Sequence, residues 1–134
     1  MVQRTVSLAA YRGQPLIVNF WATWCEPCRR EMPSLERLGA ALRPHGVPVI
    51  GVTVDADANL AREFVLQYRL SFANFRDPDL RLARDALGIS AFPATLLVGA
   101  DGRIRARVNG AREWTGAEAR RLIATHFGID VSPD

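Results

Sequence analysis

Cys25 and Cys28 are the residues whose type and spacing most directly suggest chemistry. They are the only cysteines in 134 residues, and only Glu26 and Pro27 separate them. Two thiols at this spacing can close into a small disulfide and open again, which moves an electron pair to or from the cysteines of another protein. The first hypothesis is therefore a redox-active dithiol.

The place of the pair along the chain strengthens this hypothesis. Residues 16–21 form a near-continuous apolar run, which is typical of a strand buried on both faces. Residues 26–42 carry apolar side chains at steps of three and four, which predicts a helix. A helix N-terminus presents free N–H groups and the positive end of the dipole, and both favour a thiolate. We therefore expect Cys25 to be the attacking nucleophile and Cys28 to resolve the mixed disulfide.

Three other uses of two cysteines fit the sequence less well. A purely structural disulfide would close so short a loop that it would remove little unfolded-state entropy, about 2 kcal/mol. A zinc site would need two more ligands, and the only histidines, His45 and His126, stand at no recognised spacing. Covalent haem attachment needs a histidine directly after the second cysteine, where this chain has Arg29.

Strands and helices are predicted to alternate early in the chain, followed by an antiparallel hairpin at Asp101-Gly102 and a last helix. Asp77 is expected to cap a helix with Pro78 at its first position. The fold class is therefore α/β, a three-layer α/β/α sandwich around one mixed sheet, in a single domain of residues 1–134. The expected strands are residues 5–8, 47–54, 72–75, 95–98 and 104–108 besides 16–21, and the expected helices are 58–69, 77–87 and 119–127 besides 26–42.

Charge and hydropathy exclude several classes of protein. All 17 basic residues are arginine, against 14 acidic residues, and the formal net charge is +3. These arginines alternate with acids and form no dense run, so a solvated surface is favoured over a nucleic-acid interface. No apolar stretch approaches the about 20 residues of a transmembrane helix. No signal peptide is visible, and we expect a soluble domain whose N-terminal leader or anchor is absent from this chain.

The segment around the cysteines resembles the active site of the thioredoxin superfamily. The resemblance rests first on residues 21–28, Trp-Ala-Thr-Trp-Cys-Glu-Pro-Cys. Pro33 matches the proline inside the family's active-site helix, and residues 92–95, Phe-Pro-Ala-Thr, look like the family's cis-proline loop before the third core strand. Together these motifs cover both sides of a thioredoxin-like active site.

Within the superfamily, the chain is most similar to the TlpA/ResA/CcmG (DsbE) group. The similarity rests on residues 6–13 leading into 19–22, and on Arg-Arg-Glu-Met-Pro at 29–33. That group carries an extra helix and strand between the second and third core strands, and residues 58–76 fit this insertion. The resemblance extends from about Val6 to Phe127.

The resemblance implies a periplasmic or otherwise extracytoplasmic thiol-disulfide oxidoreductase that reduces disulfides in client proteins. It implies clients of the cytochrome c maturation or copper-site assembly type, such as apocytochrome c, and a membrane electron donor of the DsbD/CcdA type. No cofactor and no metal are expected, because the Cys25–Cys28 pair holds the redox equivalents. The protein is expected to act as a monomer.

A shallow client groove is expected beside the thiols. A cis peptide at Pro93 would expose the backbone of Ala91 for pairing with an extended client segment. Asn109-Gly110 is a further candidate for the rim. The residues expected to bind the client are Trp24, Glu26, Pro27, Ala91, Phe92 and Pro93.

Three positions leave alternatives open. Asn19 stands where cytosolic thioredoxins carry a buried Asp, so the acid/base group for Cys28 is unassigned. Phe92 stands where this group often has Thr, and is either an apolar client contact or ordinary core packing. Asp55 and Asp57 are candidates for the acidic residue that related proteins place near the thiols, with solvated loop acids as the other interpretation.

Charges near the pair indicate the direction of electron flow. Glu26 beside Cys25 disfavours the thiolate, whereas Arg29 and Arg30 favour it. A strong oxidant depends on a very stable thiolate, so this balance favours a reductant. Two other functions stay open: a Cu(I)-binding thiol protein, and a peroxide-reducing relative that would use Thr23 near one reactive cysteine.

Overall fold

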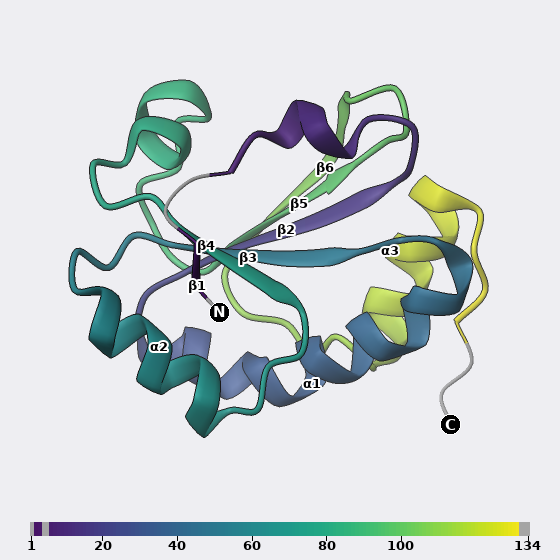
Figure 1. The fold of residues 1–134 in the computed structure, drawn as a ribbon. Coiled ribbons are helices and arrows are strands. Elements are labelled where there is room, and N and C mark those ends of the chain that lie inside the picture. The colour runs from purple at the N-terminus through teal and green to yellow at the C-terminus, as the bar shows by residue number, and fades with distance from the viewer. Residues whose placement is uncertain (1, 4–5, 132–134) are drawn as a thin grey trace.

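A mixed sheet forms the centre of the fold in the computed structural model, which describes residues 2–3 and 6–131 (Figure 1). Within these residues the strand order is β1-β4-β3-β2-β5-β6. Strands β1 to β4 run parallel to one another where they pair, and β5 and β6 are antiparallel to their neighbours. The strands are β1 (Val2–Gln3), β2 (Leu16–Trp21), β3 (Val49–Thr53), β4 (Ala73–Arg76), β5 (Ala94–Val98) and β6 (Ile104–Asn109).

Helical segments cover both faces of the sheet, which confirms the expected layered α/β fold (Figure 1). Below the sheet in that view lie α1 (Glu26–Leu42) and α2 (Ala58–Gln67), and above it lie the short helices η1 (Leu8–Tyr11) and η3 (Arg81–Ala86). The remaining helical elements are η2 (Arg43–His45), directly after α1, and α3 (Ala117–Phe127). No helix among the described residues is long and apolar enough to cross a membrane.

Strand β2 is the central element that positions the cysteines. All six of its residues are buried, because the layers above and below the sheet cover both of its faces. It pairs in parallel with β3 and antiparallel with β5. The carboxyl ends of β2 and β3 therefore meet at one edge of the sheet, where the chain turns into α1 and α2.

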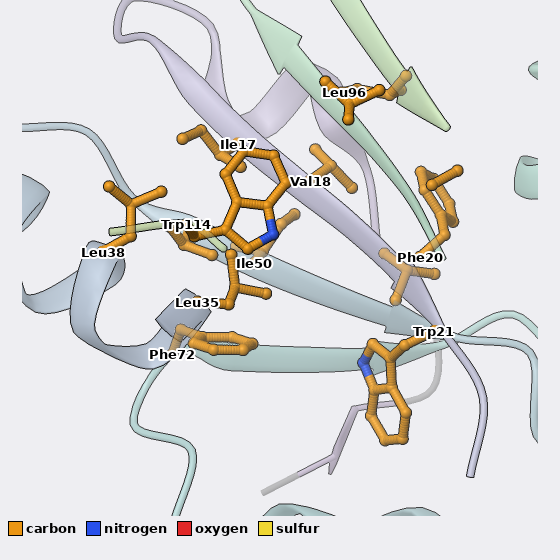
Figure 2. Packing of buried hydrophobic residues seen from close by; sticks show 14 of the residues in the cluster. Ile17, Val18, Phe20, Trp21, Leu35, Leu38, Ile50, Phe72, Leu96 and Trp114 are labelled. Atoms are coloured by element: carbon orange, nitrogen blue, oxygen red, sulfur yellow. The ribbon is translucent and has the colours of Figure 1, made fainter. Parts of the chain in front are cut away.

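Trp21, the last residue of β2, ties the predicted insertion to the core. Its ring stacks on Phe64 of α2 with 4.4 Å between ring centroids, and its Nε1 donates a 3.0 Å hydrogen bond to Asn74 Oδ1 on β4. Figure 2 shows Trp21 and Trp114 within the buried cluster that also holds Leu35 of α1. Residues 58–76 do form a helix and a strand, and this strand lies between β3 and β1.

The helix expected from Asp77 begins later and has a different geometry. Leu80 adopts a left-handed conformation with φ of 57°, and the turns that follow are of the π type, with Asp85 N bonded to Leu80 O. Asp77 does act as a cap, because its carboxylate accepts hydrogen bonds from the amides of Leu82 and Ala83. The prediction of a regular helix starting at Pro78 was therefore wrong.

The expected N-terminal strand at residues 5–8 was also misplaced. Thr5 lies outside the described residues, Val6 and Ser7 are not in a strand, and Leu8 begins η1. The amide of Ala10 bonds to the carbonyl of Ser7, so a local turn satisfies backbone groups that a strand would have paired. The edge position beside β4 is filled by Val2–Gln3 instead.

The contact between α2 and Trp21 yields a first prediction. Phe64 is 5% exposed and stacks on Trp21. Replacing it with Ala removes that contact and leaves a cavity, and we expect the free energy of unfolding to fall by about 3–4 kcal/mol. Leu66→Ala on the same helix is the control, since Leu66 is 59% exposed. Urea denaturation followed by circular dichroism measures both, and equal losses would contradict the assigned packing.

Candidate active site

Cys25 is the N-cap residue of α1, at the end of the segment that follows β2. The two cysteines form a disulfide, and the amide of Cys28 donates a hydrogen bond to Cys25 Sγ at 3.3 Å. Cys25 is 5% exposed, whereas Cys28 is 0% exposed. An incoming disulfide can therefore approach Cys25 first, and the helix amide is placed to stabilise negative charge on its sulfur.

An aromatic pair borders the exposed side of Cys25. Trp24 is 67% exposed and meets Phe92 edge-on, with 6.1 Å between ring centroids and an interplanar angle of 88°. The carbonyl oxygen of Phe92 lies 3.5 Å from Cys25 Sγ. The Phe92–Pro93 peptide is cis, as the sequence predicts, and Ala91 is exposed. Phe92 is half-buried: it packs against the core and still leaves part of its side chain accessible, so its role as a client contact stays a prediction.

The other two predicted rim residues lie between the cysteines. Glu26 is exposed, and its carboxylate forms a 2.8 Å ion pair with Arg30 one turn along α1. Pro27 is half-buried in the first turn of α1. Because Glu26 is paired and solvated, its charge acts on Cys25 only weakly.

Asp55, after β3, holds the loop before the cysteines. Asp55 is buried, and its carboxylate accepts hydrogen bonds from Thr23 N at 2.9 Å, Thr23 Oγ1 at 2.7 Å and Thr53 Oγ1 at 2.5 Å. Arg29 holds the same loop by donating from Nη1 to Thr23 O at 3.0 Å. Asp57 is the N-cap of α2. Asp55 is therefore not a solvated loop acid. The Thr23 hydroxyl donates to Asp55, so it is not free for the role that a peroxide-reducing relative would require.

Glu31 is the acidic group that sequence reasoning missed. It lies on α1 one turn after Cys28 and is only 2% exposed. Its carboxylate accepts hydrogen bonds from Asn19 Nδ2 at 2.7 Å, Trp114 Nε1 at 3.0 Å and Arg112 N at 3.1 Å. Burial raises the pKa of Glu31, and the three hydrogen bonds oppose that rise.

A signal for Glu31 was present in the sequence. Glu31, Leu35, Leu38 and Leu42 are spaced by four, three and four residues, so a carboxylate interrupts the apolar stripe of the helix. An acidic residue on a buried stripe needs hydrogen-bond donors from elsewhere in the fold. Here they come from residues far away in the sequence, including Arg112.

Asn19 joins this buried network from the centre of β2. Its Nδ2 donates both to Glu31 and to Thr95 Oγ1, the latter at 2.9 Å. Its Oδ1 has no hydrogen-bond partner among the described residues. The residue that replaces the thioredoxin Asp thus directs its amide toward a carboxylate supplied by α1.

Comparison with known proteins identifies the class of this chain. Residues 2–107 match the AhpC/TSA family. The chain is 34% identical over 120 residues to thiol-disulfide oxidoreductase ResA of Halalkalibacterium halodurans, covering 89% of this chain and 68% of the relative. It is also 34% identical over 109 residues to ResA of Oceanobacillus iheyensis, covering 81% of this chain but only 56% of that protein.

Solved structures of similar proteins support the same assignment. A putative thiol:disulfide interchange protein DsbE from Chlorobium tepidum superposes with a TM-score of 0.80 at 26% identity, covering 90% of this chain and 85% of that one. A secreted Mycobacterium tuberculosis disulfide oxidoreductase homologous to E. coli DsbE gives 0.67 at 33%, covering 75% and 72%. The chain therefore belongs to the AhpC/TSA family, has a thioredoxin fold, and falls in its ResA- and DsbE-like group of thiol-disulfide oxidoreductases.

The buried carboxylate predicts a dependence of stability on pH. Because folding raises the pKa of Glu31 above its ordinary value of 4.5, the folded state binds the proton more tightly than the unfolded state. The free energy of unfolding should therefore fall as pH rises from about 4.5 through the folded-state pKa. Glu31→Gln cannot ionise and should lack this part of the slope.

Urea titrations of both proteins at several pH values measure the slope. Glu36→Gln serves as the control, since Glu36 lies on the outer part of the same helix and bonds to Ser71. Parallel stability curves for the wild type and Glu31→Gln would contradict the assigned effect of burial.

Proposed function

We propose that this chain reduces disulfides in client proteins through the Cys25–Cys28 dithiol. The observation that supports this most is the difference between the residues: Cys25 keeps 5% of its surface accessible beside the exposed Trp24, whereas Cys28 is 0% exposed. In the reaction, the Cys25 thiolate attacks a client disulfide and releases one client thiolate. Cys28 then attacks Cys25 Sγ, releases the second client thiolate and closes the intramolecular disulfide. Two electrons pass from the dithiol to the client, and no cofactor is needed.

Glu31 is the group proposed to exchange a proton with Cys28. Cys28 must lose its proton before it attacks, and it is shielded from bulk water. Glu31 lies one helical turn away on the same buried side of α1, and burial raises the pKa of its carboxyl, which favours its holding a proton. Asn19 and Trp114 hold the carboxylate that would receive the proton.

Clients, location and electron donor follow from the relatives and remain part of the proposal. The first curated relatives are ResA proteins, and solved relatives include a putative DsbE. We propose an extracytoplasmic site of action, periplasmic in a cell with two membranes. The proposed clients are of the cytochrome c maturation or copper-site assembly type, and the proposed donor is a membrane protein of the DsbD/CcdA type. The chain would act as a monomer, with Trp24 and Phe92 contacting the client.

Trapping tests the order of attack. Cys28→Ser removes the resolving thiol, so the mixed disulfide between Cys25 and the client should accumulate. Cys25→Ser is the matched control and should trap little, because the remaining thiol is buried. The measurement is non-reducing electrophoresis of affinity-purified protein from a periplasmic extract, followed by mass spectrometry of the joined peptides. Equal trapping by both variants would reverse or remove the assigned roles.

The reduction potential tests the direction of electron flow. Glu26 is paired with Arg30 on the surface, and Arg29 is bound to the Thr23 carbonyl, so neither arginine beside the motif is directed at the Cys25 sulfur. We expect a potential well below about −150 mV, away from the DsbA end of the scale. Equilibration with glutathione buffers and tryptophan fluorescence measures it. A value above that limit would mean that the protein oxidises its clients.

A further inference from the structure

The segment between η3 and β5 is the part of the client groove that has no regular structure of its own. Residues 87–93 run from the end of η3 to the cis peptide before β5. Ile89 is fully buried and anchors the segment, whereas Ser90 and Ala91 are exposed. The Phe92 carbonyl lies against the sulfur of Cys25. The position of this segment therefore decides how a client backbone meets the reactive sulfur.

Arg107 on β6 holds the start of this segment. Its Nη1 donates to the carbonyl of Leu87 at 2.9 Å, and its Nη2 donates to the carbonyl of Gly88 at 3.2 Å. Its Nε donates to Asn109 Oδ1 at 3.3 Å, which fixes the guanidinium from the other side. The last carbonyls of a helix lack intrahelical partners, and a forked cation is well suited to bind two of them at once.

The same strand holds the other end of the segment. The amide of Gly110, directly after β6, donates to the carbonyl of Pro93 at 2.9 Å. The segment is thus bonded at both ends to residues 107–110, and the strand that carries Arg107 is itself paired along β5. Arg107 bonds to the segment through its side chain, whereas Gly110 acts through its backbone.

We propose that Arg107 is a positioning residue for client binding. It touches neither thiol, and it acts by fixing the carbonyls of Leu87 and Gly88 so that Ala91 and Phe92 present their backbone beside Cys25. Loss of this clamp leaves the dithiol chemistry intact and weakens recognition of an extended peptide. The inference rests on the proposed function, because it assumes that clients bind along residues 91–92.

Two substrates distinguish an effect of Arg107 on peptide binding from an effect on the reactivity of the dithiol. One is a short extended peptide whose single cysteine carries a 5-thio-2-nitrobenzoate leaving group, and the other is the small disulfide 5,5′-dithiobis(2-nitrobenzoate). For Arg107→Gln we expect the rate constant with the peptide to fall about fivefold, the size of a partly exposed charge-assisted hydrogen bond. The rate constant with the small disulfide and the reduction potential should stay at the wild-type values.

Two variants complete the test. Arg105→Gln is the matched control, because Arg105 lies on the same strand but pairs with Asp101 away from the groove. Arg107→Lys keeps the charge but has one donor group in place of a fork, and should recover only part of the peptide rate. Equal peptide rates for Arg107→Gln and Arg105→Gln would overturn the proposal. So would parallel losses with both substrates, which would show a general structural role.

Failure of the proposed function would look different. If the wild-type protein reacts with the peptide no faster than a free small-molecule thiol does, peptide reduction itself is refuted, whatever the variants show. A wild-type preference for the peptide that persists in Arg107→Gln would leave the function standing and remove only the role of Arg107.

Discussion

The site depends on one constraint: β2 is a central strand, buried on both faces, and the chain passes from its carboxyl end into the N-terminus of α1. Its six residues have no exposed side, so a slip by one residue would exchange the side chains of its two faces within a packed core. The register with β3 and β5 then fixes where Trp21 ends and where Cys25 caps the helix. Every property assigned to Cys25, its exposure, its amide contact and its aromatic neighbours, follows from that position.

Hydrogen bonds from distant parts of the chain then fix the surroundings of the thiols. Asp55, after β3, holds the loop that contains Thr23. Glu31 on α1 accepts hydrogen bonds from Asn19 of β2 and from Trp114. Both acids are buried, so each must be satisfied by donors, and satisfying them joins α1 to the sheet and to the segment before α3. The acids thereby hold together the elements that surround the reactive pair.

The sequence predicted those features that depend on local pattern. Helix α1 was expected at residues 26–42 and forms over the same residues, because its apolar stripe is strong and Cys25 precedes it. The hairpin at Asp101-Gly102 was also predicted, since Gly102 supplies the positive φ of 84° that the turn needs. The roles of Cys25 and Cys28 in disulfide exchange stay predictions.

Features that depend on distant partners were not predicted. The leucines of the η3 region have helical spacing, yet Leu80 takes a left-handed conformation that tertiary contacts must stabilise, with Asp77 capping the turns that follow. Glu31 is bonded to Trp114, 83 positions away, so the local pattern can place Glu31 on the buried stripe but cannot name the donors that satisfy it. The clamp made by Arg107 likewise joins carbonyls 19 and 20 positions distant.

The central claim is that position alone makes Cys25 the reactive thiol. Brief treatment of the reduced protein with iodoacetamide, followed by mass spectrometry of the peptides, measures which cysteine is labelled first. The N-cap position of Cys25 and its small accessible surface, against none for Cys28, predict that Cys25 carries nearly all of the early label, while Cys28 reacts only after unfolding. Labelling of Cys28 at the same rate or faster would contradict the account.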